Sequence, residues 1–165
     1  MDTAKIVAKM NAALERELHE VVRYMHQSFW VKGPRASRLR AFFREQSRES
    51  MGHATTLGEL IVSLGGRPVV KILEIYEPGS QSDAELLKEC VHHEEAACEG
   101  YKRMLPLVDG EPRLKRIIAG LAREEGEHIV AIRRMAERIA RAGTPARVAG
   151  RKSVDTIPRG RNGRA

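Results

Sequence analysis

The last long helical stretch of the chain carries apolar residues at alternating steps of four and three, from Leu114 to Ile139. Two positions in the middle of this row hold Glu125 and His128 instead of apolar residues. Because residues at this spacing share one face of an α-helix, the pattern predicts that a charged pair points toward a helical core. The helix must therefore pack against others that compensate the buried charge.

Three earlier stretches show the same periodicity, and turn residues separate them. We expect helices over residues 3–31, 35–64, 82–106 and 112–142. Gly65 and Gly66 end the second helix, and Ser82 with Glu85 has the spacing of a capping box at the start of the third. Short turns join the first helix to the second and the third to the fourth, so each of these pairs is predicted to be antiparallel.

The connection over residues 65–81 is long enough to cross the whole bundle. Its 17 residues can span about 56 Å at about 3.3 Å each, whereas a helix of about 28 residues is about 42 Å long. The second and third helices can therefore run in the same direction. The expected fold is an all-α four-helix bundle with one long crossover between helices two and three.

The apolar rows of the other helices are also interrupted near their middles. Glu17 lies in the row of the first helix, His53 in that of the second and Glu94 in that of the third. We expect these residues to meet Glu125 and His128 at one level of the bundle. Three buried carboxylates without partners would cost several kcal/mol each. Oxygen and imidazole ligands from four facing helices suit a pair of iron or manganese ions. The alternative is a solvated helix face. That alternative would explain a single Glu-x-x-His, but it would not explain charged residues in the apolar rows of four helices.

Three stretches of the sequence carry a resemblance to a known family: RELHEVVRYMHQSF, ESMGHATTLGELIVSLGGRPVV and EEGEHI. Over roughly residues 3–140, the chain resembles the bacterioferritin branch of the ferritin-like superfamily. The resemblance implies a bundle in which each half supplies a terminal Glu and a bridging Glu-x-x-His. It also implies that a bound pair of irons oxidises Fe(II) for storage in a hollow shell.

Carried over by this resemblance, Glu17 and Glu94 correspond to the terminal carboxylates and Glu125 to a bridging carboxylate. His53 and His128 correspond to the imidazole ligands. These five residues are the expected metal ligands and the expected catalytic site of a ferroxidase.

One ligand of the family pattern is missing, because Ser50 stands where a second bridging Glu is expected, three residues before His53. Three carboxylates leave excess positive charge beside two Fe(II) ions, so we expect weaker binding of the second metal and a weakened ferroxidase. Glu49 is a candidate replacement ligand, since it lies about 40° from His53 around the helix and its long side chain could bend inward. The alternative is a solvated or salt-bridged Glu49.

Met51 lies about where the resemblance implies a methionine that ligates haem at a two-fold axis between subunits. A thioether can be an axial haem ligand, and it can equally fill a dimer contact. We expect one of these two roles for Met51, within a two-fold dimer. The apolar residues off the inward rows that predict such a surface are Met25, Phe29, Trp30, Phe42, Met51 and Ile61.

The sequence after the fourth helix differs from the rest in composition. We divide the chain into a bundle domain, 1–142, and a basic tail rich in Gly, Pro and Arg, 143–165. Most of the net charge of +7 lies in this tail. It can attract nucleic acid electrostatically, but no aromatic residue is interleaved with the basic ones, so nucleic acid is not the favoured partner. The tail also lacks the amphipathic fifth helix that the resemblance implies for closing a 24-subunit shell.

Other features narrow the function. There is no run of about 18 apolar residues and no secretory-type N-terminus, so we expect a cytoplasmic protein without a membrane partner. The leading hypothesis is a homo-oligomer that oxidises Fe(II) at a di-iron site and stores or detoxifies iron. One alternative is a structural or haem b-bearing subunit that assembles with an active ferritin partner. Another is a DNA-associating protective relative.

Overall fold

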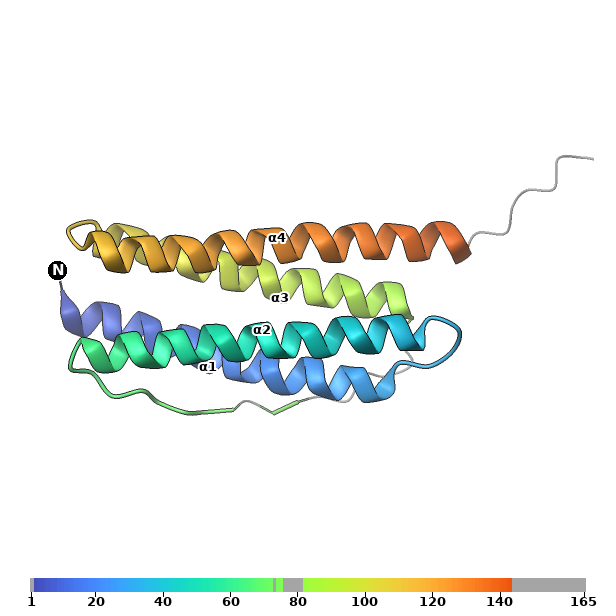
Figure 1. The fold of residues 1–165 in the computed structure, drawn as a ribbon, viewed down its shortest axis with the longest axis horizontal. Coiled ribbons are helices and arrows are strands. Elements are labelled where there is room, and N and C mark those ends of the chain that lie inside the picture. The colour runs from blue at the N-terminus through green and yellow to red at the C-terminus, as the bar shows by residue number, and fades with distance from the viewer. Residues whose placement is uncertain (1, 73, 76–81, 144–165) are drawn as a thin grey trace, which may run out of the picture.

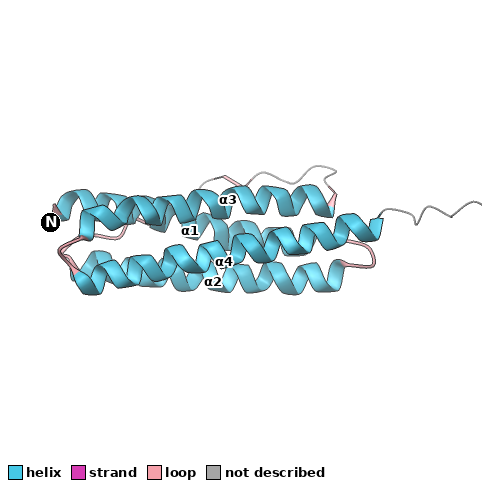
Figure 2. Ribbon diagram, turned by 90° about the horizontal axis from the view of Figure 1, so that it is seen from above, coloured by secondary structure: helices cyan, strands magenta, loops and turns pink. Residues whose placement is uncertain are grey.

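The computed structural model describes residues 2–72, 74–75 and 82–143 of the chain, and the described part consists of helices and connecting segments (Figure 2). The helices are α1 (Thr3–Trp30), α2 (Ala36–Ser63), α3 (Asp83–Met104), the short 3₁₀ helix η1 (Leu105–Val108) and α4 (Pro112–Gly143). The four expected helices are thus confirmed. The third ends two residues earlier than expected, because Pro106 has no amide proton to continue α-helical bonding and the chain tightens into η1.

The helices form two antiparallel pairs. Figure 1 shows α1 beside α2 and α3 beside α4, with α2 and α3 running in the same direction. The connection between α2 and α3 begins along α1, because the side chain of Asn11 donates to the carbonyl oxygen of Arg67 at 3.1 Å and accepts from the amide of Val69 at 2.7 Å. Residues 73 and 76–81 of the expected crossover lie outside the described residues.

Local sequence signals fix the helix ends. The capping box of α3 is present as expected: the hydroxyl oxygen of Ser82 accepts from the Glu85 amide, and the Glu85 carboxylate accepts from the Ser82 amide. Gly65, just after α2, has a φ of +74°, a left-handed conformation that glycine adopts without steric cost. At the start of α1 the carboxylate of Asp2 accepts from the amide of Lys5.

Two separate apolar clusters fill the bundle, one toward each end. The first includes Ile6, Leu57 and Ile118, and the second includes Phe43 and Leu87. The charged positions of the helical rows lie between these clusters. A polar layer in the middle of the bundle is therefore held on both sides by packed side chains, which fix the positions of its backbone atoms.

Three further observations concern the cysteines, the apolarity of the helices and the tail. Cys90 and Cys98 are buried free thiols. No helix in the described part of the chain is long and apolar enough to cross a membrane. The expected basic tail lies outside the described residues from residue 144 onward, so its boundary with the bundle and its binding of nucleic acid stay predictions.

Candidate metal centre

Five predicted side chains from the four helices gather in the polar layer. Glu17 comes from α1, His53 from α2, Glu94 from α3, and Glu125 and His128 from α4. They form two groups of three, Glu17–His53–Glu125 and Glu94–Glu125–His128, and within each group the candidate ligand atoms lie within 4.8 Å of one another. Glu125 belongs to both groups. This arrangement suits two cations linked by one shared carboxylate.

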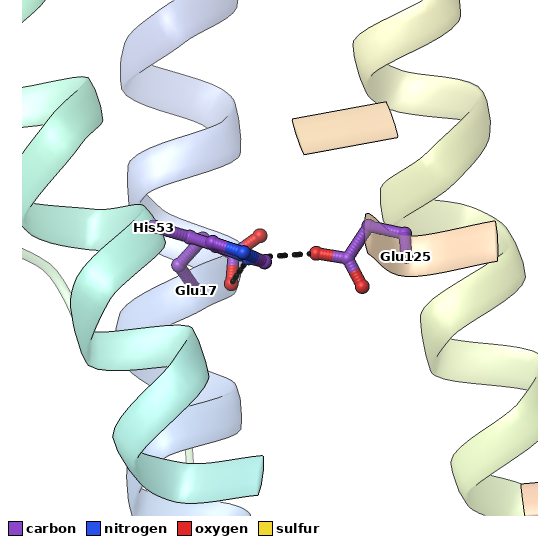
Figure 3. A group of neighbouring side chains, drawn as sticks. All are labelled: Glu17, His53 and Glu125. Atoms are coloured by element: carbon purple, nitrogen blue, oxygen red, sulfur yellow. Dashed lines mark ion pairs between the residues drawn. The ribbon is translucent and has the colours of Figure 1, made fainter. Parts of the chain in front are cut away.

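The first group centres on the Nδ1 atom of His53. This nitrogen lies 2.9 Å from Oε1 of Glu125 and 3.6 Å from Oε2 of Glu17. Figure 3 marks both ion pairs with dashed lines. All three side chains are buried. Oε2 of Glu125 is also buried and accepts no hydrogen bond from a described residue. A cation would satisfy this oxygen, and carboxylate–imidazole donor sets of this kind suit iron or manganese.

The second group repeats the arrangement of the first. Nδ1 of His128 lies 3.7 Å from Oε2 of Glu94 and 3.5 Å from Oε2 of Glu125. The two imidazole rings are stacked, with centroids 6.1 Å apart and planes 17° from parallel. Both histidines therefore turn the same ring nitrogen toward the carboxylates.

Tyrosines hold the two outer carboxylates of the centre. The hydroxyl of Tyr101 on α3 donates to Glu17 of α1 at 2.7 Å, and the hydroxyl of Tyr24 on α1 donates to Glu94 of α3. In the sequence each Glu precedes the tyrosine of its own helix by seven residues. In the structure each Glu instead binds the tyrosine of the opposite helix. Burial raises the pKa of both tyrosines well above the usual range, so they act as neutral donors.

The histidines supply the positive charge of this layer. Burial lowers the pKa of His53, but the carboxylates of Glu125 and Glu17 outweigh it and raise the pKa to about 11. Burial and the carboxylates of Glu125 and Glu94 oppose each other in the same way at His128, whose pKa rises to about 10. Without metal, two imidazolium ions therefore balance most of the carboxylate charge.

The carboxylates of Glu94 and Glu125 have different proton affinities. Burial raises the pKa of Glu94 to about 7, and the nearby charge of Glu125 acts in the same direction. Burial also acts to raise the pKa of Glu125, but the imidazoles of His128 and His53 outweigh it and lower that pKa. The shared carboxylate is therefore the one that stays ionised.

The position of the missing carboxylate is occupied by a buried serine. Ser50 is 8% exposed. Glu49, the candidate replacement, lies outside both groups of ligand atoms: its Oε2 lies 3.1 Å from Nε2 of His128 and accepts from the side-chain amide of Gln46. The structure thus has Glu49 in the salt-bridged arrangement that was the alternative to metal binding.

Sequence reasoning missed one residue of this region, Glu124. Its Oε2 lies 3.1 Å from Nε2 of His53. Glu49, Glu124 and both histidines line a cleft of about 580 Å³ between α2 and α4. The spacing Glu-x-x-x-His occurs in ESMGH and in EEGEH, but it occurs also in ERELH and in ECVHH, so the sequence alone does not single out this residue.

The outer faces of α1 and α2 carry exposed apolar side chains. Met51 is 47% exposed, and Met25, Phe29 and Trp30 are exposed as expected. Two other predictions for this surface are wrong. Ile61 is fully buried in the first apolar cluster, and Phe42 packs against the second cluster. Their helical positions fall at the edge of the inward rows, where the neighbouring helices cover them.

Comparisons with known proteins agree with this architecture. The model of the Ferritin-like domain family matches residues 7–142. A bacterial non-heme ferritin of Bacteroides fragilis strain 638R is 22% identical over 87% of this chain and 91% of that protein. A bacterioferritin of Desulfovibrio desulfuricans is 26% identical over 91% of this chain and 86% of its own length.

A solved structure shows the same fold. The crystal structure of a ferritin-like, diiron-carboxylate protein from Bacillus anthracis superposes with a TM-score of 0.77. The match covers 82% of this chain and 98% of that one, at 22% identity.

Proposed function

Because the chain belongs to the Ferritin-like domain family, we propose that its central polar layer binds two iron ions and oxidises Fe(II) to Fe(III) for storage or detoxification. The observation that carries the proposal is Glu125, a buried carboxylate that is common to two carboxylate–imidazole groups. The stability of an apolar core does not require two histidines and three carboxylates inside it. A pair of divalent cations accounts for this donor set.

Each residue has a defined part in this proposal. Glu17 and His53 hold one Fe(II), Glu94 and His128 hold the other, and Glu125 bridges the two. The bound ions are the substrate, and each loses one electron. Together the two electrons and two protons reduce one dioxygen to hydrogen peroxide, or one hydrogen peroxide to two waters. Tyr24 and Tyr101 are outside this set of ligands, and their hydroxyls keep the terminal carboxylates oriented.

Ser50 leaves the centre with three carboxylates, whose charge falls one short of the charge of two Fe(II) ions. Because Glu125 is common to both groups, the missing carboxylate removes a second link between the metals and does not remove one half of the site. We therefore expect two metals to bind, with the second binding weakened by the excess positive charge. Iron oxidation should be slower than in a variant that restores this carboxylate.

Crystals soaked anaerobically in Fe(II) and measured at the iron absorption edge test metal binding directly. Two anomalous peaks are expected between the Nδ1 atoms of His53 and His128. Crystals of Glu125→Ala should show neither peak, and this variant should not oxidise Fe(II). Glu127→Gln should keep both peaks and the oxidation of Fe(II). Glu127 is a suitable control because its side chain is 70% exposed and lies near Arg123 in solvent. Fe(II)-saturated wild-type crystals without iron in this layer would refute the proposal.

We further propose that the chain assembles through the exposed apolar faces of α1 and α2 into two-fold dimers, which can build a larger shell. Apolar patches of this kind usually mark contacts with another chain. Light scattering should give a particle mass at least twice the 18.5 kDa of the chain. A stable monomer would contradict this assembly.

Two observations favour a second candidate, a haem-bearing or structural subunit that assembles with an active ferritin partner. Ser50 removes a bridging carboxylate, and Met51 is exposed on the proposed dimer face. A thioether from each protomer can ligate one haem iron. Purification with a red colour and a Soret band, together with absent Fe(II) oxidation, would favour this candidate over the first.

A further inference from the structure

Each histidine of the polar layer has a second ring nitrogen that points away from the three central carboxylates. Nε2 of His53 lies 3.1 Å from Oε2 of Glu124, and Nε2 of His128 lies 3.1 Å from Oε2 of Glu49. The side chains of Glu49 and Glu124 are 38% and 45% exposed, at the wall of the cleft between α2 and α4. Each imidazole therefore lies between buried carboxylates at Nδ1 and a solvent-facing carboxylate at Nε2.

The two outer contacts are related by a crossed pairing. Glu49 precedes His53 by four residues on α2, and Glu124 precedes His128 by four residues on α4. Residues four apart lie on the same face of a helix and could contact each other. Instead, the Glu of each helix contacts the histidine of the other helix. The same spacing on two facing helices thus produces two equivalent contacts across the cleft.

A carboxylate at Nε2 determines how an imidazole can bind metal. It accepts the Nε2 proton, which leaves the lone pair of a neutral ring on Nδ1, and it opposes rotation of the ring. It also makes Nδ1 a stronger donor. In both histidines Nδ1 is the nitrogen that faces Glu125.

We propose that Glu49 and Glu124 are positioning residues, which hold His128 and His53 respectively with Nδ1 directed at the metal pair. The proposal rests on the proposed function, since it assigns these residues a role toward the same metals. It also gives Glu49 a role in place of metal ligation: a carboxylate engaged at the outer nitrogen of His128 is not the replacement for the bridge missing at Ser50.

The test uses Co(II) and Zn(II) with the full-length protein. We expect Glu49→Ala and Glu124→Ala to weaken Co(II) binding by about 10-fold to 100-fold, as loss of such outer contacts typically does. Glu49→Gln and Glu124→Gln should give intermediate losses, because the amide oxygen still accepts a hydrogen bond. Glu127→Gln removes a charge from the same cleft without touching an imidazole, and its affinity should stay within about 2-fold of the wild type.

Nitrogen-15 NMR of the imidazoles in the Zn(II)-loaded protein provides a readout of the crossed pairing. Glu124→Ala should shift the Nε2 resonance of His53 and leave that of His128 unchanged, and Glu49→Ala should do the reverse. The proposal would be overturned by an unchanged Co(II) affinity in the alanine variants, or by an equal loss of Co(II) affinity in Glu127→Gln. It would also be overturned if an alanine substitution shifted the Nε2 resonance of the histidine on its own helix.

Failure of the proposed function would look different. Wild-type protein that binds neither Co(II) nor Fe(II) would refute the metal centre and with it any positioning role toward metal. In that case the Nε2–H protons of the metal-free protein still report the contacts. If these protons exchange slowly in the wild type, Glu124→Ala should speed exchange at His53 and Glu49→Ala should speed exchange at His128. That result without metal binding would show that the pairing is structural only.

Discussion

Metal binding at the polar layer should expel protons, because both histidines carry a proton in the metal-free protein. The pKa of His53 is about 11 and that of His128 is about 10, since the neighbouring carboxylates outweigh the effect of burial. A metal ion needs the lone pair of Nδ1, so each imidazolium must lose a proton when its metal binds. Near pH 7 this requirement applies to nearly every molecule in solution.

Glu94 adds to the number of protons released. Its pKa of about 7 means that about half of the molecules carry a proton on this carboxyl at pH 7. We therefore expect about 2.5 protons to leave for every two metals bound. Each proton changes the binding free energy by about 1.4 kcal/mol per pH unit. Raising the pH from 6.5 to 7.5 should thus strengthen the combined binding of two metals by about 300-fold, or about 3.4 kcal/mol.

Isothermal titration calorimetry with Zn(II) can count these protons. The observed heat is measured in several buffers with different enthalpies of ionisation, and its slope against that enthalpy gives the protons released. The His128→Gln variant should bind one of the two metals more weakly, and it should release about one proton fewer than the wild type. Release of fewer than one proton by the wild type at pH 7 would refute the imidazolium pair and the balance of charge derived from it.

Three further predictions concern the same regions. The melting temperature of the metal-free protein should fall as the pH rises from 6.5 to 10. The folded protein keeps the imidazolium protons of His53 and His128 up to their raised pKa values, whereas the unfolded chain loses them near its pKa of about 6.5, so the stabilisation is complete below about pH 6.5 and is lost as the pH rises toward the raised values. A rising melting temperature, measured by calorimetry, would contradict this. Ser50→Glu should raise the rate of Fe(II) oxidation several-fold in stopped-flow absorbance, and Ser50→Ala should not. Met51→Leu should remove any Soret band while light scattering still reports the dimer, and a Soret band that survives would exclude Met51 as the haem ligand.

The helices and the polar layer could be predicted because both depend on the period of the sequence. Steps of three and four residues identify one face of a helix, and a charged residue in such a row must lie among apolar ones. This reasoning correctly brought Glu17 of α1 and Glu94 of α3 to the same level as the histidines. It needed no knowledge of side-chain conformation, since each residue was placed only by its face and height.

Contacts within the layer could not be predicted in the same way. A face of a helix does not specify which helix a long side chain reaches, so the binding of Glu124 to His53 and of Tyr101 to Glu17 was not foreseen. The periodic rows also have edges, and there the packing of neighbouring helices decides burial. Ile61 was expected on the surface for this reason, but it lies in the core.

The repeated spacings indicate how the loss at Ser50 affects the centre. The spacing from Glu to Tyr occurs on both α1 and α3, and the spacing Glu-x-x-x-His occurs on both α2 and α4. In the polar layer, the Glu-x-x-His spacing that supplies Glu125 on α4 has no counterpart on α2, where Ser50 stands three residues before His53. The surrounding contacts therefore keep an approximate two-fold symmetry that the bridge lacks. Since Glu125 touches both groups of ligands, the coupling between two bound metals depends on this one carboxylate, and a change there should affect both ions together.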